Sequence, residues 1–316
     1  MSKPILVIDG LNVFYRHFIA NPSMSENGES VGGIVGFLKG LQLLCERYNP
    51  DNVVIIWEGG GSPRRRSVDP TYKGGRRPER LNRFYSDDNI PNTVGNRNSQ
   101  IVDLVDLVKL TGLRQVYVSD CEADDIIAYL VNAVYTDSRC VIVSTDKDFY
   151  QLINSTNVVW SPGSKKQWDC ESVLKKFTIH PNNFCLARCF IGDASDGLKG
   201  VPGAGFRSLA KRFPSFESEV SLCVDDILTK CRKLREQKRL KLYDSIIDNE
   251  EIVRRNWKLM YLGQGNLSGT QIQKVEGALE SEPVKRNKLR FIRSLMNLQI
   301  KNVDYDKLFM TLKAFN

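Results

Sequence analysis

Residues 5–10 read ILVIDG, an apolar run that ends on a carboxylate, and this arrangement recurs along the chain. The other segments are VVIIWEG (53–59), CEADD (121–125), VIVSTDKD (141–148) and IGDASD (191–196). A carboxylate buried without a partner is costly, so acids beside buried strands need a nearby positive charge if they converge. Oxygen ligands without a neighbouring set of His or Cys favour Mg²⁺ or Mn²⁺ over zinc. The sequence therefore predicts a divalent-metal site.

The apolar runs alternate with segments of helical spacing. The strand-like runs are 4–9, 53–58, 115–119 and 141–145, and the helical segments are 31–47, 99–111 and 123–135. This alternation predicts an α/β domain with a central, mainly parallel sheet flanked by helices, and a small hairpin at 157–169. Asp9, Glu58 and Asp146 each end a strand, where open α/β sheets place their ligands. Any one of these acids alone would be explained as a cap or turn residue, but several strand ends together are not.

Two acidic segments need a closer reading. We expect Glu122 in a loop and Asp124 and Asp125 in the first turn of the following helix, where the helix N-terminus favours negative charge. Asp146 and Asp148 are two residues apart, so they face the same way if the strand direction persists.

Charge is distributed unevenly along the 316 residues, which are enough for one large or two modest domains. The net charge is +8, yet residues 64–83 and 230–241 each carry a local +6, which leaves −4 for the remainder. A basic rim around an acidic centre favours a polyanion held by its phosphates. For 230–241 a solvated helix face is an equal alternative.

Other features exclude several classes of protein. The sequence contains no run of about 18 apolar residues and no signal-peptide pattern, so we expect a cytoplasmic protein without membrane association. Eight scattered cysteines without a CxxC pair are typical of reduced thiols. Only two histidines occur, His17 and His180, which argues against histidine-based catalysis and against zinc.

After residue 170 the chain becomes helical and basic. Two short helices, 184–190 and 206–213, are joined by the loop GDASDGLKGVPGAG (192–205). No strand precedes this loop and no acidic ribose partner follows it, so it is not a Rossmann turn. We expect free backbone N–H groups at the start of the second helix to hold one phosphate without reading bases. The residues expected to contribute are Lys199, Gly200, Gly203, Gly205, Arg207 and Lys211.

Five segments in this order resemble the flap endonuclease / 5′-nuclease family, which has a PIN-like fold. They are VIDGLN (7–12), PTYKGGR (70–76), EADDIIAYL (122–130), STDKDFYQL (144–152) and GDASDGLKGVPGAG (192–205). The resemblance covers roughly residues 4–215. Residues 157–168 and 289–302 are similar to the phage branch in particular, which includes phage 5′-exonuclease and phage ribonuclease H.

The resemblance implies two Mg²⁺ ions, for which Mn²⁺ can substitute. The ligands of the first would be Asp9, Glu58, Glu122 and Asp124, and those of the second Asp146, Asp148, Asp193 and Asp196, with Asp124 shared. Position 58 is Glu where the family more often has Asp, so Glu58 is expected to reach its ion through water. Asp125 has the weakest claim as a ligand. The resemblance also implies K⁺ at a helix–three-turn–helix loop within about 184–213.

The basic segment resembles the arch of that family, at about 60–98. The resemblance implies that Lys73 binds the scissile phosphate and that Arg76 binds transition-state charge or the neighbouring phosphate. Tyr72 either stacks on a displaced base or packs internally. The residues expected to guide the single-stranded 5′ end are Arg64, Arg65, Arg66, Arg77, Arg80 and Arg83.

The resulting expectation is a 5′-nuclease that cuts 5′ ends and flaps of DNA, and RNA–DNA duplexes during primer removal. Two ions about 4 Å apart can hydrolyse a phosphodiester without a side-chain base. We expect residues 1–170 to form the catalytic domain and 171–316 a helical DNA-binding domain that could dock a single-strand-binding protein or a DNA polymerase. A monomer is expected, in the host cytoplasm if the source is a phage. The alternatives are a PIN-type endoribonuclease acting on single-stranded RNA and a structure-specific DNA-binding protein without activity.

Overall fold

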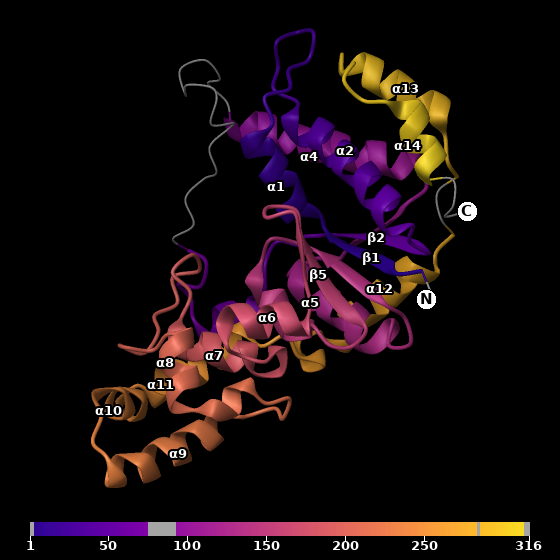
Figure 1. Ribbon diagram of the computed structural model, residues 1–316. Coiled ribbons are helices and arrows are strands. Elements are labelled where there is room, and N and C mark those ends of the chain that lie inside the picture. Colours follow the sequence, from indigo (N-terminus) through magenta and orange to yellow (C-terminus); the bar gives the residue numbers. More distant parts are fainter. Residues whose placement is uncertain (1–2, 75–92, 283–284, 313–316) are drawn as a thin grey trace.

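A six-stranded sheet forms the centre of the computed structural model, which describes residues 3–74, 93–282 and 285–312 (Figure 1). Its strands are β1 (Ile5–Asp9), β2 (Asn52–Trp57), β3 (Arg114–Tyr117), β4 (Cys140–Val143), β5 (Asn157–Ser161) and β6 (Lys166–Trp168). Their order is β3-β2-β1-β4-β5-β6, and all are parallel except β6, which pairs antiparallel with β5. The predicted α/β class, parallel sheet and hairpin are confirmed.

Helices cover both faces of this sheet (Figure 1). On one face lie α1 (Gly10–Ala20), α2 (Gly32–Tyr48), α4 (Thr93–Leu110), α13 (Lys288–Asn297) and α14 (Tyr305–Thr311). On the other side lie α5 (Ala123–Tyr129), α6 (Cys170–Phe177), α7 (Phe184–Ile191), α8 (Phe206–Arg212) and α11 (Glu250–Met260), with α9 (Val224–Gln237) and α10 (Lys241–Asp248) farther from the sheet. The short α3 (Pro63–Val68) contacts α11, and α12 (Gly269–Glu280) contacts β3.

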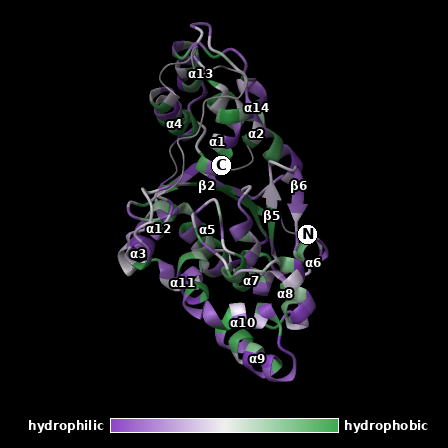
Figure 2. Cartoon of the chain, turned by 90° about the vertical axis from the view of Figure 1, so that its left-hand side faces the viewer, coloured by the Kyte–Doolittle hydropathy of each residue, from purple (hydrophilic) through white to green (hydrophobic). Residues whose placement is uncertain are grey.

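The strands are apolar on both sides because both faces of the sheet are buried. Ile5 and Val7 of β1 pack into one core, and Leu6 and Ile8 pack into the other. Figure 2 shows the central strands in the green of apolar residues, with purple on the outer sides of the helices. No helix in the described part of the chain is long and apolar enough to cross a membrane.

The order of the strands places the acids at one edge. Strand order reverses between β1 and β4, and this reversal is where doubly wound sheets bind ligands. Asp9 ends β1, Glu58 follows β2, and Glu122 precedes α5 in extended conformation, as predicted. Asp124 and Asp125 lie in the first turn of α5, which is also as predicted.

The direction of β4 does not persist to Asp148. The strand ends at Val143, and Asp146 caps a 3₁₀ helix, Lys147–Leu152, by accepting the N–H of Asp148 at 2.8 Å. Asp146 therefore lies at the start of the 3₁₀ helix and Asp148 in its first turn, so the expected strand alternation does not apply to them. The turn forms because a carboxylate that accepts a local backbone N–H competes with continued extension.

Gly59 holds together the two loops that carry Glu58 and Glu122. Its N–H donates to the carbonyl of Cys121 at 3.0 Å, and its carbonyl accepts the N–H of Asp120 at 2.8 Å. A Cβ at position 59 would lie 1.6 Å from the carbonyl oxygen of Val118, so only glycine permits this approach.

We predict that Gly59→Ala lowers the free energy of unfolding by at least about 2 kcal/mol, because the backbone of two loops must shift. Urea unfolding measures this change. Gly265→Ala is the matched control, because a Cβ there has no neighbour within 4 Å. Equal stability of the two variants would contradict the predicted role of Gly59.

Candidate active site

A cavity of about 740 Å³ opens at the carboxyl edge of the sheet. Five of the predicted metal ligands and the predicted catalytic lysine line it: Asp9, Glu58, Glu122, Asp124, Asp146 and Lys73. The remaining lining residues described by the structure are Leu11, Asn12, Tyr15, Arg16, Ile19, Ala20, Gly61 and Thr145. The structure thus brings together acids from four successive strand ends.

Asp9 is held between the ends of β1 and β4. Its Oδ1 accepts the N–H of Asn12 at 3.1 Å, and its Oδ2 accepts the hydroxyl of Ser144 at 3.0 Å. The side-chain oxygen of Asn12 in turn accepts the N–H and the hydroxyl of Thr145, each at 2.9 Å. The sequence analysis did not identify Asn12 or Ser144, although both are polar residues close to a strand-end acid.

The carboxylates in the cavity lack sufficient positive charge. Burial raises the pKa of Asp9 to about 7, and the charges of Asp146 and Glu58 add to this effect. Burial also raises the pKa of Asp124 well above its usual value, although Lys73 opposes the shift. The pKa of Glu58 is raised by burial and by the charge of Glu122. Each raised pKa means that removing the proton is unfavourable until a cation is present.

Glu122 is the acid with the most complete set of cation contacts. Its Oε2 lies 2.7 Å from Nζ of Lys73 and 2.9 Å from Nη1 of Arg65. Burial lowers the pKa of Lys73, but the negative charges of Asp124 and Glu122 have the larger effect and raise this pKa above its usual value. The ring of Tyr72 lies 5.1 Å from Nζ of Lys73, and Tyr72 packs against the core, which corresponds to the internal alternative for this residue.

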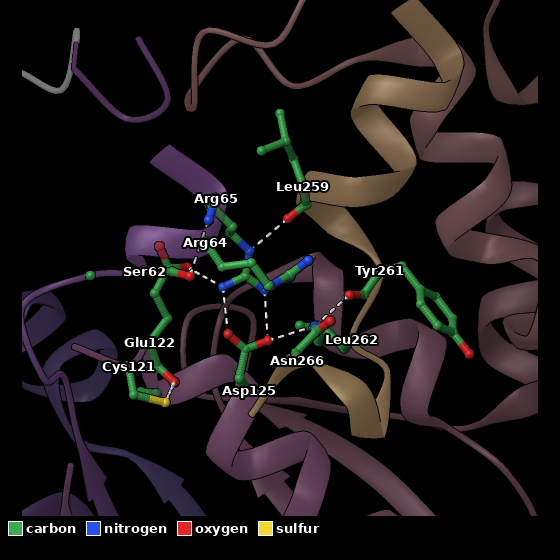
Figure 3. A network of polar contacts seen from close by, with 12 residues as sticks. Ser62, Arg64, Arg65, Cys121, Glu122, Asp125, Leu259, Tyr261, Leu262 and Asn266 are labelled. Carbon is green, nitrogen blue, oxygen red and sulfur yellow. Dashed lines mark hydrogen bonds and ion pairs between the residues drawn. The ribbon is translucent and has the colours of Figure 1, made fainter. Parts of the chain in front are cut away.

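Arg65 is buried, which corrects its predicted role as a guide for the 5′ strand (Figure 3). Its guanidinium forms a bidentate ion pair with Asp125, at 2.6 and 2.7 Å, in addition to the contact with Glu122. Its Nε donates to the carbonyl of Leu259 at 2.8 Å, and Asn266 donates to Asp125 at 2.8 Å. Arg65 is therefore an internal counter-ion, and Asp125 is its partner, which agrees with the weak claim of Asp125 as a ligand.

Asp148 and Asp193 form a second acidic group, which does not line the main cavity. Nη2 of Arg188 bridges them, 3.0 Å from Oδ1 of Asp148 and 2.5 Å from Oδ2 of Asp193. Burial and the charge of Asp146 still raise the pKa of Asp148 to about 7. Burial opposes ionisation of Asp193, but hydrogen bonds from Ser195 and the charge of Arg188 hold its pKa below the usual value.

The sequence analysis missed Arg188. It is the one charged residue in the apolar helix FCLARCF, and such a residue must face a partner when the helix is buried. Asp196 is buried nearby, and its carbonyl accepts the N–H of Lys73 at 3.4 Å. Lys73 itself has a φ of 58°, in the left-handed region.

The donor set fits hard divalent cations. Carboxylate oxygens supply all the predicted ligands, and three of the lining acids have raised pKa values. Within residues 3–74, 93–282 and 285–312, no group of three or more ligand-type side chains is arranged to hold an ion directly. Lys73, Arg65 and Arg188 instead contact oxygens of three predicted ligands, Glu122, Asp148 and Asp193.

The other predicted nucleic-acid contacts differ in exposure. Arg66 is exposed, whereas Arg64 is half-buried and donates to the carbonyl of Lys258 at 3.2 Å. Lys199, Arg207 and Lys211 are exposed at the loop and helix around α8. Arg76, Arg77, Arg80 and Arg83 lie outside the described residues.

For two glycines of this loop, the structure gives a local explanation that does not involve a bound phosphate. A Cβ at Gly200 would lie 2.0 Å from the carbonyl oxygen of Ile191, so this glycine permits backbone packing. The N–H of Gly205 donates to the hydroxyl of Ser208 at 2.8 Å, so it is not one of the free N–H groups that we expected. Gly203 has a φ of 83°, and a Cβ there would lie 3.8 Å from Cδ1 of Leu242.

The fold and the site together define a nuclease of the PIN-like α/β class, and the comparisons with known proteins agree. Residues 4–178 match the family described as 5′-3′ exonuclease, N-terminal resolvase-like domain. The chain belongs to this 5′-3′ exonuclease family. The resemblance found in the sequence is confirmed, and the family favours a nuclease over a DNA-binding protein without activity.

Relatives extend the likeness over most of the chain. A 5′-3′ exonuclease of Aquifex aeolicus is 26% identical over 312 residues, which are 97% of this chain and 96% of that protein. Flap endonuclease Xni of Shewanella halifaxensis is 27% identical over 248 residues, 76% of this chain and 89% of that protein. The flap endonuclease of bacteriophage T5, solved with DNA and metal ions, shares the fold with a TM-score of 0.66 and 18% identity, over 94% of this chain and 99% of that chain.

We predict that Arg65→Met lowers the free energy of unfolding by about 3–5 kcal/mol, because Asp125 and Glu122 lose a buried partner. Arg66→Met is the matched control on the same helix, with an exposed side chain, and should change stability by less than about 0.5 kcal/mol. Urea unfolding at pH 7 measures both. Similar stability of the two variants would show that Arg65 is not the counter-ion of this site.

A second prediction concerns pH. The folded-state pKa values of Asp9 and Asp148, about 7, lie above the usual 3.8, so folding favours the protonated forms. Their contribution to stability is fully present below pH 3.8 and is lost as the pH rises through about 7. Asp9→Asn and Asp148→Asn cannot ionise at these positions. In EDTA, each should therefore lose less stability between pH 5 and 8 than the wild type, by about 1 kcal/mol or more. Parallel stability curves would contradict the raised pKa values.

Proposed function

We propose that this chain is a divalent-metal-dependent 5′-nuclease that hydrolyses phosphodiester bonds at 5′ ends and flaps of DNA, in replication, primer removal or repair. The observation that carries the proposal is the cavity lined by five carboxylates and Lys73, in a chain of the 5′-3′ exonuclease family. The names of the relatives, 5′-3′ exonuclease and flap endonuclease, support the same reaction. RNA–DNA duplexes are proposed as a further substrate.

The proposed metal is Mg²⁺, as two ions, with Mn²⁺ as a substitute. Asp9, Glu58, Glu122 and Asp124 would hold one ion, and Asp146, Asp148, Asp193 and Asp196 the other, with Asp124 shared. The raised pKa values of Asp9, Asp124 and Asp148 support this assignment, because burial and neighbouring acids disfavour the charged carboxylates more than the nearby cations favour them. When bound, the metal supplies an activated water and neutralises charge on the transferring phosphate. K⁺ at the loop before α8 stays a prediction.

The residues of the chain itself would orient the substrate. Glu58 accepts the N–H of Gly61 at 3.0 Å and the N–H of Ala123 at 3.2 Å, one on each oxygen. These contacts fix its carboxylate and support the proposal that it acts through water. Lys73, which contacts Glu122, would transfer to the scissile phosphate when a strand enters the cavity. Arg65 would remain on Glu122, because it is buried.

The proposed nucleic-acid surface extends beyond the cavity. The exposed Lys199, Arg207 and Lys211 around α8 would contact phosphates of the duplex. We retain the division into a catalytic domain, 1–170, and a helical DNA-binding domain, 171–316, as a proposal. A monomeric state and a single-strand-binding protein or DNA polymerase as partner are proposed in the same way.

The function is tested by Asp124→Asn and Asp146→Asn on a 5′-labelled flap, a nicked duplex and an RNA–DNA duplex across a Mg²⁺ titration. We predict that each variant lowers the cleavage rate by at least about 100-fold, because a metal ligand is lost. Asp137→Asn, an exposed acid away from the cavity, is the control and should cut like the wild type. Cleavage of flaps by the two site variants at the wild-type rate would reject the proposed function.

Lys73→Ala separates catalysis from binding. We predict that it retains the affinity for flap DNA but slows single-turnover cleavage by at least about 100-fold, because its charge acts on the phosphate during reaction. Anisotropy gives the affinity, and quenched-flow product sizing gives the rate. Equal losses in affinity and rate would instead show that Lys73 only positions the strand.

A further inference from the structure

A second cavity, of about 610 Å³, lies between α1, α2 and the turn of the β5–β6 hairpin. We call it the α1–α2 groove. Its lining includes Arg16, Leu43, Glu46, Arg47, Trp160 and Lys165. In Figure 1 the turn of the hairpin lies beside α1. The groove combines an apolar wall with three cations, and its size is in the range that holds a ligand as large as a nucleotide.

The three cations of the groove are available to an anion. In the part of the chain that the structure describes, Arg16, Arg47 and Lys165 form no ion pair with a carboxylate. Glu46 is the acid among the described lining residues, and its Oε1 is already bound by Nζ of Lys307 at 3.0 Å. The groove therefore carries uncompensated positive charge, which is complementary to phosphate.

The groove adjoins the carboxylate cavity, because Arg16 lines both. A Cβ built on Gly163, in the hairpin turn, would lie 3.3 Å from Nη1 of Arg16 and 3.2 Å from Cγ2 of Thr145. Thr145 lines the carboxylate cavity beside Asp146. Arg16 thus lies between the two cavities, beside the hairpin turn and Thr145.

Arg47 lies over an aromatic side chain inside the groove. Its guanidinium carbon lies 4.1 Å from the ring centroid of Trp160 and 5.6 Å from that of Tyr48. Trp160 is 8% exposed and forms the floor, whereas Arg47 is exposed above it. A guanidinium that lies over an aromatic ring can also contact the face of a nucleobase. Leu43, which is 61% exposed, adds an apolar contact beside it.

We propose that the α1–α2 groove binds a single-stranded segment of the DNA on which the carboxylate cavity acts. Phosphates lie on Arg16 and Lys165, and one base stacks on Arg47. Because these contacts use the backbone and the face of a base, binding is independent of sequence. The inference rests on the proposed nuclease function, since it places the segment next to the strand that is cut.

The test measures anisotropy of a labelled oligothymidine and of a blunt duplex, in EDTA so that neither is cut. Arg47→Ala should weaken binding of the single strand by about 5- to 100-fold, the range for loss of one stacked base. Lys165→Ala should reduce the slope of log K against log salt by about 0.7, the value for one lost phosphate contact on a single strand. Neither variant should change binding of the blunt duplex by more than about 2-fold, because a base-paired strand has no free base to stack on position 47.

Two further variants separate stacking from charge. Arg47→Lys keeps the charge but removes the planar group, so it should weaken single-strand binding while the salt slope stays as in the wild type. Lys274→Glu is the control: it reverses an exposed charge on α12, which contacts β3 at the opposite edge of the sheet, and should bind like the wild type. Wild-type single-strand binding by the Arg47 and Lys165 variants, or an equal loss on the blunt duplex, would overturn the proposal.

The inference and the proposed function fail separately. If the wild type cuts flaps in Mg²⁺ but the groove variants bind single strands normally, the groove is rejected and the nuclease stands. If the groove variants lose single-strand binding as predicted but the wild type cuts no substrate in Mg²⁺, the binding groove stands and the nuclease is rejected.

Discussion

Carboxylates at one edge of a parallel sheet repel one another, and the arrangement of the site depends on the cations that balance this repulsion. Burial makes the repulsion stronger, because there is little water to screen it. Among the residues that the structure describes, Arg65, Lys73 and Arg188 contact these acids. They do not balance the charge completely, since the pKa values of Asp9, Asp124 and Asp148 remain raised. The remaining deficit is what a divalent cation would supply.

These cations differ in how permanently they are held. Arg65 is 1% exposed and bonded to Asp125, Glu122 and the carbonyl of Leu259. Removing it would leave buried charges without a partner, so it behaves as part of the core. Lys73 is partly exposed and has one close partner oxygen, on Glu122. Lys73 is therefore accessible to a phosphate, as its proposed role requires, whereas Arg65 is not.

The helices that follow the catalytic core also support the site. Leu259, at the end of α11, and Asn266 both contact the network of Arg65 and Asp125. Asn256 of α11 is fully buried and donates to the carbonyls of Cys189 and Lys199, each at 2.9 Å. These contacts connect α11 to the loop that carries Asp193. The C-terminal half thus fixes the position of acids from both groups.

The sequence predicted what depends on local pattern. Alternating apolar runs and helices located the strands, and acids at strand ends located the cavity, because parallel strands bring their carboxyl ends to one edge. It could not predict which basic residues are buried. Arg65 is followed by an exposed arginine in the same run, and its partners Glu122 and Asp125 lie 57 and 60 residues away. Arg188 and the turn at Asp146 likewise depend on tertiary contacts that no local pattern encodes.

The measurement that bears most directly on the carboxylate site is the number of protons released when Mg²⁺ binds at pH 7. Calorimetry in two buffers with different heats of ionisation gives this number. Because the pKa values of Asp9 and Asp148 are raised to about 7, part of these groups is protonated and must ionise when the metal binds. We predict a net release of about one proton, reduced in Asp9→Asn. Mg²⁺ binding without proton release, or the absence of Mg²⁺ binding, would contradict the account that these carboxylates form a divalent-cation site.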